Sequence, residues 1–408
     1  MINQLEKKIL NRSSSPYLEE FAERMPELKR QVSGKRILAI GAAGSIGAET
    51  VKKLLHLAPA SICVVDVNEN GLAELIRQLR SSDDDGIRNV ADFRTIPLDF
   101  GSPIFRRFLA SEGPFDIILN FAAIKHVRSE KDVFSILHMI DTNILKPAQV
   151  LSHLAEQSWS GRYFSVSTDK AANPSSLMGA TKRLMEHVMF HRSGYASGGI
   201  TRTSARFANV AFSNGSLLQS FETRLRERQL LACPVDIKRY FVTLAESGAI
   251  CALASLLVDD GHIAIPNLDP EENLVLLTSV AQHFLESRGI EAVFFHEEEE
   301  ARAFLRTNSE PRKYPVFLTP ADTAGEKPYE EFVAANESVK DVGLLSLRAV
   351  RHAPPQADMG PLLEKLTELR DGVADGVDKL MIKELIASIE PDFARTHIES
   401  EKSLDQRA

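Results

Sequence analysis

The sequence predicts an α/β protein built on a doubly wound parallel sheet, with a smaller C-terminal lobe. Between residues 35 and 210, apolar strand-like runs without polar alternation are separated by helical segments, a pattern typical of a parallel sheet covered on both faces. A glycine-rich turn joins the first run to a helix, and the regular pattern loosens after residue 210. The 408 residues are enough for two or three domains of about 150 residues each.

The predicted elements follow one another in four stretches. Residues 1–34 carry apolar positions at helical spacing among many charges, which predicts one or two amphipathic helices. The main domain, 35–210, has predicted strands in "KRILAI" and at 61–67, 94–99, 115–123, 161–167 and 201–211. Residues 211–350 predict a substrate-binding lobe that returns to the core, and residues 351–408 predict a linker and a C-terminal helical tail.

Composition narrows the class of partner. A net charge of −8 gives no electrostatic footprint for nucleic acid or an anionic membrane surface. The three cysteines, Cys63, Cys233 and Cys251, lie far apart in apolar surroundings, which favours buried thiols in a reducing compartment over disulfides or a zinc site. No apolar run long enough to span a bilayer and no leader is evident. We therefore expect a cytoplasmic protein with a small-molecule partner and no membrane insertion.

The turn "GAAGSIG" predicts a dinucleotide site. Its glycines, Gly41, Gly44 and Gly47, follow a strand and open a helix, so backbone amides can approach a pyrophosphate without an intervening Cβ atom. Ser45 and Ile46 lie inside the same turn and join the predicted cofactor contacts. This order of strand, turn and helix predicts a Rossmann domain.

Residues after the next three strands extend the cofactor prediction. Asp66 ends the second strand about 20 residues beyond the turn, where a carboxylate can accept hydrogen bonds from the adenosine ribose. No arginine follows it in "VVDVNENG", which favours NAD over NADP. Asp99 is placed to meet the adenine, and Ala122 and Ala123 follow the fourth strand. For both aspartates, ordinary strand-end polarity is the alternative interpretation.

Six segments in order carry a more specific signal: "GAAGSIGAE", "NFAAIKHVRSEKD", "STDKAANPSSLMGATKR", "RFANVAFSNGS", "RYFVT" and "GEKPYEEF". Together they resemble the polysaccharide-biosynthesis (CapD-like) branch of the extended short-chain dehydrogenase/reductases, the UDP-N-acetylglucosamine 4,6-dehydratases, over residues 35–335. The resemblance implies an internal redox cycle. Hydride moves from C4 of the sugar to NAD, the resulting ketone acidifies H5, water leaves from C6, and hydride returns to C6.

The resemblance also assigns catalytic roles. Asp169 would protonate the departing C6 hydroxyl if burial favours its acid form, and Lys170 would take the C5 proton. Lys182 would contact the nicotinamide ribose, and Thr168 the C4 hydroxyl of the sugar. Without the resemblance, Asp169 and Lys170 would be interpreted as a surface ion pair, and Lys182 as a solvated helix lysine.

Met178 stands where this superfamily has a tyrosine, four residues before Lys182. A thioether cannot exchange the C4 hydroxyl proton, which must then leave through water, Thr168 or Lys182. Larger membrane-associated members of the branch resemble this chain in having the methionine. We therefore expect a soluble, methionine-type dehydratase.

The resemblance implies a substrate site made of residues from both halves of the chain. Instead of contacting the substrate, His126 could equally be a hydrogen-bonded core histidine. For Arg239, the alternative to a substrate contact is an ordinary surface charge. The family's arginine and proline before "GEK" are replaced here by "ADTAGEK", and its "GD" by "PLDFG". These departures affect the nucleotide contacts more than the reaction class. The predicted substrate residues are Lys125, His126, Asn143, Asn209, Ser216, Arg239 and Glu326.

Two other functions share these features. A nucleotide-sugar 4-epimerase would use the same fold and cofactor, but it needs no acid at C6 and normally has the tyrosine. A non-catalytic NAD-binding protein would have no chemical need for Asp169, Lys170 and Lys182 together. Because members of the superfamily usually pair through helices of the α/β domain, we expect a homo-oligomer.

Overall fold

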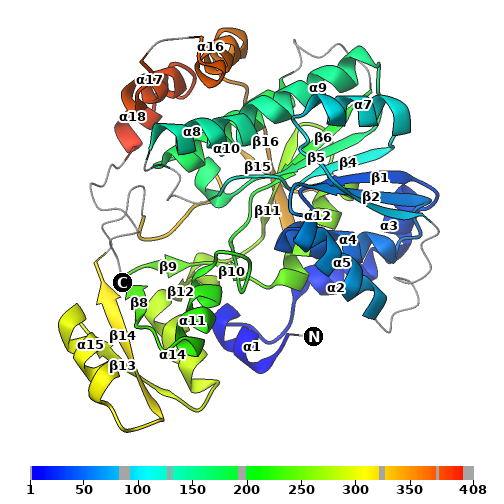
Figure 1. The fold of residues 1–408 in the computed structure, drawn as a ribbon. Helices are drawn as coiled ribbons and strands as arrows, with labels where there is room; N and C mark the ends of the chain where they lie inside the picture. The colour runs from blue at the N-terminus through cyan, green and yellow to red at the C-terminus, as the bar shows by residue number, and fades with distance from the viewer. Residues whose placement is uncertain are drawn as a thin grey trace.

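The large sheet organises the chain. A computed structural model describes residues 2–81, 92–125, 130, 132–191, 199–320, 327–373 and 376–397. Within these ranges nine strands form one sheet in the order β15-β16-β11-β6-β5-β4-β1-β2-β3 (Figure 1). The strands are β1 (Arg36–Ile40), β2 (Ser61–Asp66), β3 (Phe93–Pro97), β4 (Ile117–Asn120), β5 (Arg162–Val166), β6 (Thr201–Ala205), β11 (His262–Pro266), β15 (Val339–Lys340) and β16 (Leu347–Arg351).

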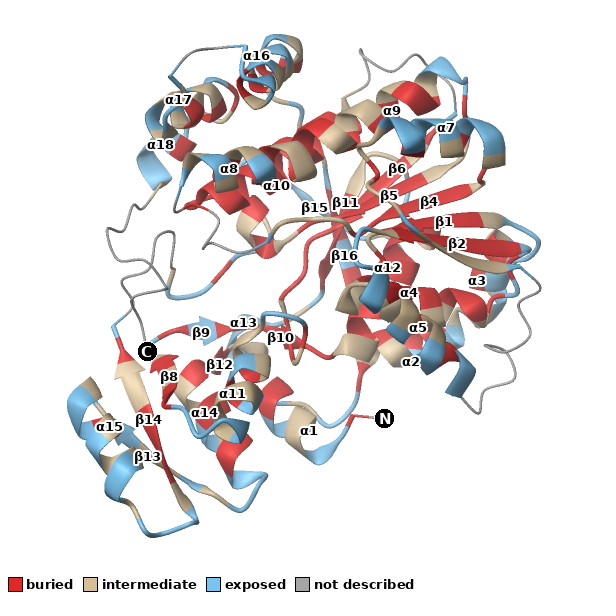
Figure 2. Cartoon of the chain, in the orientation of Figure 1, coloured by how far each residue is buried: buried red, intermediate tan, exposed pale blue. Residues whose placement is uncertain are grey.

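The sheet is parallel from β3 to β11, and β16 and β15 add an antiparallel edge. The predicted doubly wound sheet is thus confirmed. The predicted strand at 115–123 shortens to Ile117–Asn120, and the one at 201–211 divides into β6 and β7 (Asn209–Val210). The inner strands are buried almost throughout, which explains why their sequences lack polar alternation (Figure 2).

Helices cover both faces of the sheet (Figure 1). One face carries α4 (Ser45–Leu55), α5 (Glu69–Ser81) and α12 (Leu244–Leu257). The other carries α7 (Pro103–Glu112), α8 (Val133–Ile140), the π-helical turn η2 (Asp141–Leu145), α9 (Lys146–Glu156) and α10 (Leu177–Phe190). All 14 residues of α10 are buried, so this helix lies inside the molecule, between the sheet and other elements.

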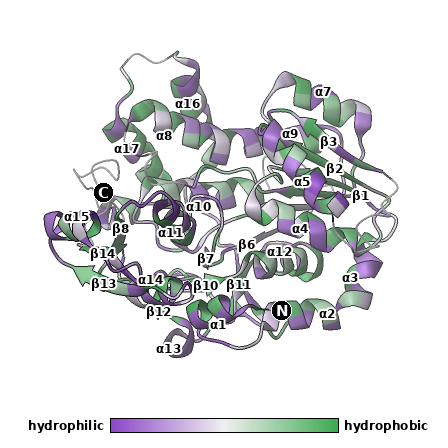
Figure 3. Cartoon of the chain, turned by 60° about the horizontal axis from the view of Figure 1, so that its bottom comes forward, coloured by the Kyte–Doolittle hydropathy of each residue, from purple (hydrophilic) through white to green (hydrophobic). Residues whose placement is uncertain are grey.

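A second lobe has its own small sheet and core. Strands β8 (Leu231–Pro234), β14 (Lys313–Thr319) and β13 (Glu291–Phe295) are parallel, and α11 (Leu217–Arg226), α14 (Leu277–Glu286) and α15 (Glu298–Thr307) accompany them. Phe221, Phe284 and Val316 belong to its hydrophobic core. Helix α15, with three glutamates in its first turn, is largely hydrophilic (Figure 3). Short pairs link the lobe to the sheet domain: β7 with β10 (Phe241–Val242), and β9 (Lys238–Arg239) with β12 (Val275–Leu276), the latter preceded by α13 (Pro270–Asn273).

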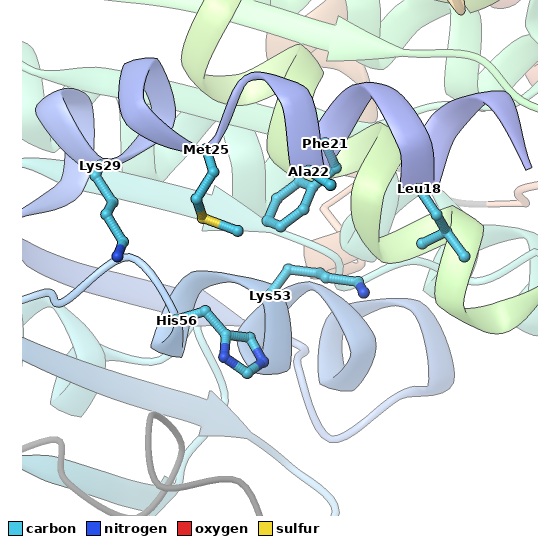
Figure 4. Close-up of a pocket in the computed structure, with 7 residues that line it drawn as sticks. All are labelled: Leu18, Phe21, Ala22, Met25, Lys29, Lys53 and His56. Atoms are coloured by element: carbon cyan, nitrogen blue, oxygen red, sulfur yellow. The ribbon is translucent and has the colours of Figure 1, made fainter. Parts of the chain in front are cut away.

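Three helices precede the sheet: α1 (Gln4–Leu10), α2 (Pro16–Glu23) and α3 (Met25–Val32). A hollow of about 540 Å³ lies between α2, α3 and α4, and the residues that line it include Phe21, Met25, Lys53 and His56 (Figure 4). Lys53 and His56 lie at the C-terminal end of α4, opposite its glycine turn. This hollow is therefore separate from the predicted cofactor site.

The C-terminal helices pack against the sheet domain. They are α16 (Met359–Asp371), α17 (Lys379–Ile389) and α18 (Phe393–Thr396). Arg370 of α16 pairs with Asp141 of η2 at 3.2 Å, and α17 lies against α10. None of the helices in the described ranges is long and apolar enough to cross a membrane. All three cysteines are free and buried, as predicted.

Candidate active site

The carboxyl ends of β1, β2, β4 and β5 meet at one edge of the sheet. Strand β1 lies between β2 and β4, so the chain turns in opposite directions on the two sides of β1. A ligand crevice is expected at such a reversal in open α/β sheets. The predicted catalytic and cofactor residues end or follow one of the parallel strands, or lie in the first two turns of a helix that begins at this edge.

The glycine turn is closely packed. Gly41 has φ +70°, and a Cβ atom on it would lie 2.4 Å from the backbone nitrogen of Ala122. A Cβ atom on Gly47 would lie 2.5 Å from Cα of Ala42. Gly44 caps α4, whose first residue is Ser45. The turn therefore needs glycine for backbone reasons, and it leaves the amides at the start of α4 available to an anion.

Asp66 is fixed against this turn. Its Oδ2 accepts a hydrogen bond from the amide of Ala43 at 3.0 Å, and its Oδ1 accepts one from the amide of Asn68 at 2.9 Å. The carboxylate thus lies beside the glycine turn at the end of β2, with lone pairs remaining on both oxygens. The carboxylate can therefore accept hydrogen bonds from hydroxyl groups placed beside the turn.

Asp99 has a partner that the sequence did not indicate. Lys146 of α9 donates to its Oδ2 at 2.9 Å, and the amide of Gly101 donates to its Oδ1 at 2.9 Å. Burial raises the pKa of Asp99, but these two donors lower it by more than burial raises it, so the net direction is downward. Asp99 therefore stabilises the loop after β3 through Lys146.

Asn143 orders the loop after β4. It exchanges two hydrogen bonds of 2.9 Å with the backbone of Ile124 and donates to Thr181 of α10 at 3.0 Å. The bonds hold the loop that contains Ala122 and Ala123 against α10, and Lys125 is exposed at its end. Asn143 is itself buried, so it contacts the loop backbone and α10. His126 and Glu326 lie outside the described residues.

The catalytic segment begins directly after β5. Thr168 donates to Oδ1 of Asp169 at 2.7 Å, and the backbone and side-chain nitrogens of Lys170 donate to the same oxygen at 2.9 and 3.1 Å. Asp169 is 3% exposed, whereas the Lys170 side chain is 26% exposed. A Cβ atom on Gly179 would lie 2.6 Å from the Lys170 carbonyl oxygen, so α10 is packed directly against this pair.

Two residues from the second half of the chain reach the same pair. Glu330 lies 3.7 Å from the Lys170 ammonium, and Arg239 lies 4.0 Å from Glu330. Arg239 also donates to the carbonyl oxygen of Lys327 at 2.9 Å. Glu330 belongs to the "GEKPYEEF" segment, but nothing in the sequence singled it out. Its distance from Lys170 along the chain hides the contact.

Met178 is buried at the start of α10. Its amide donates to Glu130 at 2.9 Å, so this carboxylate caps the first turn of the helix. Burial raises the pKa of Glu130, although the amides of Met178 and Leu177 lower it. No pattern in the sequence indicates Glu130, which stabilises the position where the superfamily has its tyrosine.

Lys182 reaches the end of β5. Its ammonium donates to the carbonyl oxygen of Val166 at 2.7 Å and to the sulfur of Met185 at 3.2 Å. Burial lowers the pKa of Lys182 to about 8, although Glu186 raises it. The lowered pKa makes the ammonium a readier proton donor than that of an ordinary lysine.

A buried ion cluster lies behind the catalytic segment. Arg206 and Glu186 are fully buried and pair at 2.7 Å, and Glu337 pairs with Arg206 and with Arg183 at 2.6 Å each. Glu186 also accepts a hydrogen bond of 2.6 Å from Ser167. The charged residues of this cluster stand singly within apolar stretches of the sequence, so no sequence pattern indicated that they pair.

Two predicted substrate residues lie where the lobe meets the sheet domain. Asn209 is in β7, paired with Phe241 of β10. Ser216 caps α11, and its hydroxyl accepts the amide of Gln219 at 3.3 Å. The amide of Asn214, in the same loop, donates to Ser45 at 3.0 Å, so the "SNGS" loop contacts the glycine turn.

A family model described as "Polysaccharide biosynthesis protein" matches residues 37–349. An uncharacterised membrane protein of Methanocaldococcus jannaschii is 31% identical over 57% of this chain and 66% of its own length. The capsular polysaccharide biosynthesis protein CapD of Staphylococcus aureus is 26% identical over 62% of this chain and 41% of its length. A UDP-N-acetylglucosamine 4,6-dehydratase (inverting) of Campylobacter jejuni is 27% identical over 58% and 68%. The matched region thus spans less than two thirds of the first two relatives.

Solved structures share the fold at lower identity. Pen from Bacillus thuringiensis superposes with a TM-score of 0.62 at 20% identity, covering 80% of this chain and 88% of that protein. WbmF from Bordetella bronchiseptica, solved with NADH, superposes with a TM-score of 0.52 at 13% identity, covering 90% and 98%. These similarities establish the α/β fold.

Proposed function

Because the chain belongs to the polysaccharide biosynthesis protein family, we propose that it is an NAD-dependent nucleotide-sugar 4,6-dehydratase. Its substrate would be UDP-N-acetylglucosamine or a close relative, and its product a UDP-4-keto-6-deoxy sugar for surface polysaccharide or glycan synthesis. One observation carries the proposal: the Asp169–Lys170 pair, joined at 3.1 Å at the end of β5 and packed against α10. Elimination needs an acid and a base on one sugar, and this pair offers both.

The cofactor site fits NAD. Gly41 and Gly47 allow the turn its close packing against Ala122 and Ala42, and Asp66 presents a carboxylate beside the same turn. Gly41, Gly44, Ser45, Ile46 and Gly47 would hold the pyrophosphate, with Asp66 at the ribose. When bound, NAD supplies reversible hydride acceptance. The chain's own residues must then supply the proton transfers.

Two proton transfers fall to the Asp169–Lys170 pair. Three hydrogen bonds converge on Oδ1 of Asp169, so Oδ2 would carry the proton given to the leaving C6 hydroxyl. Lys170 would accept the C5 proton in its neutral form, and its ammonium would return a proton to C5 when the hydride reaches C6. Its partial exposure leaves its ammonium access to a bound sugar.

The proton of the C4 hydroxyl needs another route, because Met178 cannot take it. Thr168 begins the catalytic segment, and Lys182 lies at the end of β5 with a pKa of about 8. We propose that Thr168 contacts the hydroxyl and that Lys182, in its neutral form, accepts the proton.

The nucleotide half of the substrate would lie between the two lobes. Arg239 is held by backbone carbonyl oxygens, so its guanidinium is already ordered for a diphosphate. Asn209 and Ser216 lie in the loops that join the lobe to the glycine turn. We propose these three residues as the diphosphate and sugar contacts.

The test is incubation of purified protein with UDP-N-acetylglucosamine in deuterated water without added NAD, followed by NMR and mass spectrometry. We expect a 4-keto-6-deoxy product with deuterium at C5. A C4 epimer that retains its C6 hydroxyl would instead identify a 4-epimerase. Unchanged substrate with every UDP- and dTDP-hexose tried would favour a non-catalytic NAD-binding protein.

A further inference from the structure

Four charged side chains meet at the catalytic segment, and one of them has no role in the proposed reaction. We call residues 327–337 the strap, because this segment contacts the catalytic segment at several points. Glu330 of the strap is 3% exposed. Its Oε1 lies 3.7 Å from the Lys170 ammonium and 4.0 Å from Arg239. The Lys170 ammonium thus has two carboxylates close to it, Asp169 at 3.1 Å and Glu330 at 3.7 Å.

The strap is anchored independently of Glu330. The ammonium of Lys327 donates to the carbonyl oxygen of Asn173, and Asn173 donates to Glu331 at 2.8 Å. At the other end, Glu337 pairs with Arg206 at 2.6 Å. These contacts hold the strap on both sides of Glu330, so its carboxylate has a fixed place beside Lys170.

The charges around Lys170 and Glu330 shift the pKa values of both residues. Burial and, to a lesser extent, Arg239 lower the pKa of Lys170. Asp169 and Glu330 together raise it by more, so the net direction is upward. Burial raises the pKa of Glu330, and Asp169 adds to this, against Lys170, Arg239 and Lys327. The ammonium is therefore the favoured form of Lys170 in the protein without substrate.

We propose that Glu330 is a positioning residue that holds the Lys170 ammonium beside Asp169 and sets the pH range in which Lys170 can accept a proton. The catalytic meaning of this inference rests on the proposed dehydratase function, in which Lys170 takes the C5 proton. Because Glu330 also faces Arg239, it joins the proposed diphosphate contact to the proton-transfer pair.

The first test measures Lys170 directly and needs no turnover. Trace acetylation of the full chain over a pH series, read by peptide mass spectrometry, gives the midpoint at which Lys170 becomes nucleophilic, with exposed Lys340 as internal reference. In the wild type we expect the Lys170 midpoint above the value of about 10.4 for free lysine. Glu330→Gln should lower it by about one to three pH units, the effect of removing a near opposite charge.

Two variants separate charge from packing. Glu330→Asp keeps the charge and should stay near the wild-type midpoint. Glu331→Gln removes the charge of the exposed neighbour, keeps an oxygen that can accept the hydrogen bond from Asn173, and should not shift the midpoint. An unchanged midpoint in Glu330→Gln, or equal shifts in Gln and Asp, would overturn the inference. If Glu330→Gln does not fold, a wild-type midpoint at or below that of Lys340 would overturn it.

Turnover supplies the second readout. In Glu330→Gln, the acid limb of the pH profile of kcat should move to lower pH, while KM stays nearly unchanged because Arg239 keeps its backbone contacts. A shifted acetylation midpoint in a protein that forms no 4-keto product would leave the Glu330 inference standing and refute the dehydratase function. Normal formation of the 4-keto product with an unshifted midpoint would refute the Glu330 inference and leave the dehydratase function standing.

Discussion

The fully buried Glu186 is expected to stabilise the fold and the catalytic segment together. It accepts hydrogen bonds from Arg206 at 2.7 and 2.8 Å and from Ser167 at 2.6 Å, and it lies on α10 one turn after Lys182. Glu186→Gln keeps the shape of the side chain and removes its charge. The change leaves the buried Arg206 guanidinium with Glu337 as its remaining close carboxylate.

The magnitude follows from the pKa of Glu186. Burial raises this pKa, but Arg206 and Arg183 lower it more, from its ordinary value of 4.5 to about 2. At about 1.4 kcal/mol per unit, the charged form adds about 3 kcal/mol to the free energy of unfolding at pH 7. Breaking a buried ion pair by removing one partner costs about 3–5 kcal/mol, which agrees. Because the pKa is lowered on folding, this stabilisation is present above pH 4.5 and is lost as pH falls toward 2.

Urea unfolding, followed through the fluorescence of buried Trp159, measures this effect. We expect Glu186→Gln to lose about 3 kcal/mol at pH 7, with the difference from wild type falling to less than half near pH 3. Glu368→Gln, which removes an exposed pair with Lys365, is the control and should change stability by about 0.5 kcal/mol or less. A loss below about 1 kcal/mol at pH 7, or a difference that does not change with pH, would refute the reasoning.

Three further predictions concern the site. Asp169→Asn should bind NAD normally, by calorimetry, and slow water loss by about 10²-fold or more, and unchanged turnover would show that the acid is another residue. Met178→Tyr should remain active or gain activity in the same product assay; complete inactivation would mean that the methionine fills space a phenol cannot. Gly41→Ala should weaken NAD binding about tenfold or more, because its Cβ atom would meet Ala122 at 2.4 Å and φ is +70°; equal affinity would contradict the packing argument.

The sequence predicted the parts of the fold whose signals are local. The inner strands are apolar on both faces because helices cover both sides, and that leaves a readable pattern. Gly41 was predicted because the tight turn after the first strand requires a glycine. Asp66 was predicted because an acidic residue is typical at the end of the second strand of this fold. Asp169 and Lys170 were found through the resemblance, since their adjacency alone is ordinary.

Features that depend on distant contacts were not predictable. Glu330 meets Lys170 only because the strap crosses the catalytic segment, and no spacing rule connects the two residues. Glu186 and Arg206 lie in apolar stretches, where single charges do not reveal a partner. The C-terminal helices illustrate the same limit: Glu390 contacts His187 and pairs with Arg183 at 3.3 Å on α10, which composition alone cannot indicate.

The most direct test of the central claim follows a label through one turnover. UDP-N-acetylglucosamine deuterated at C4 is incubated with the protein, without added NAD, and the product is examined by NMR. An internal redox cycle with elimination by Asp169 and Lys170 predicts that the C4 deuterium appears at C6 of a 4-keto-6-deoxy product. Deuterium retained at C4 of an epimer, or its absence from C6 of a keto product, would contradict the account.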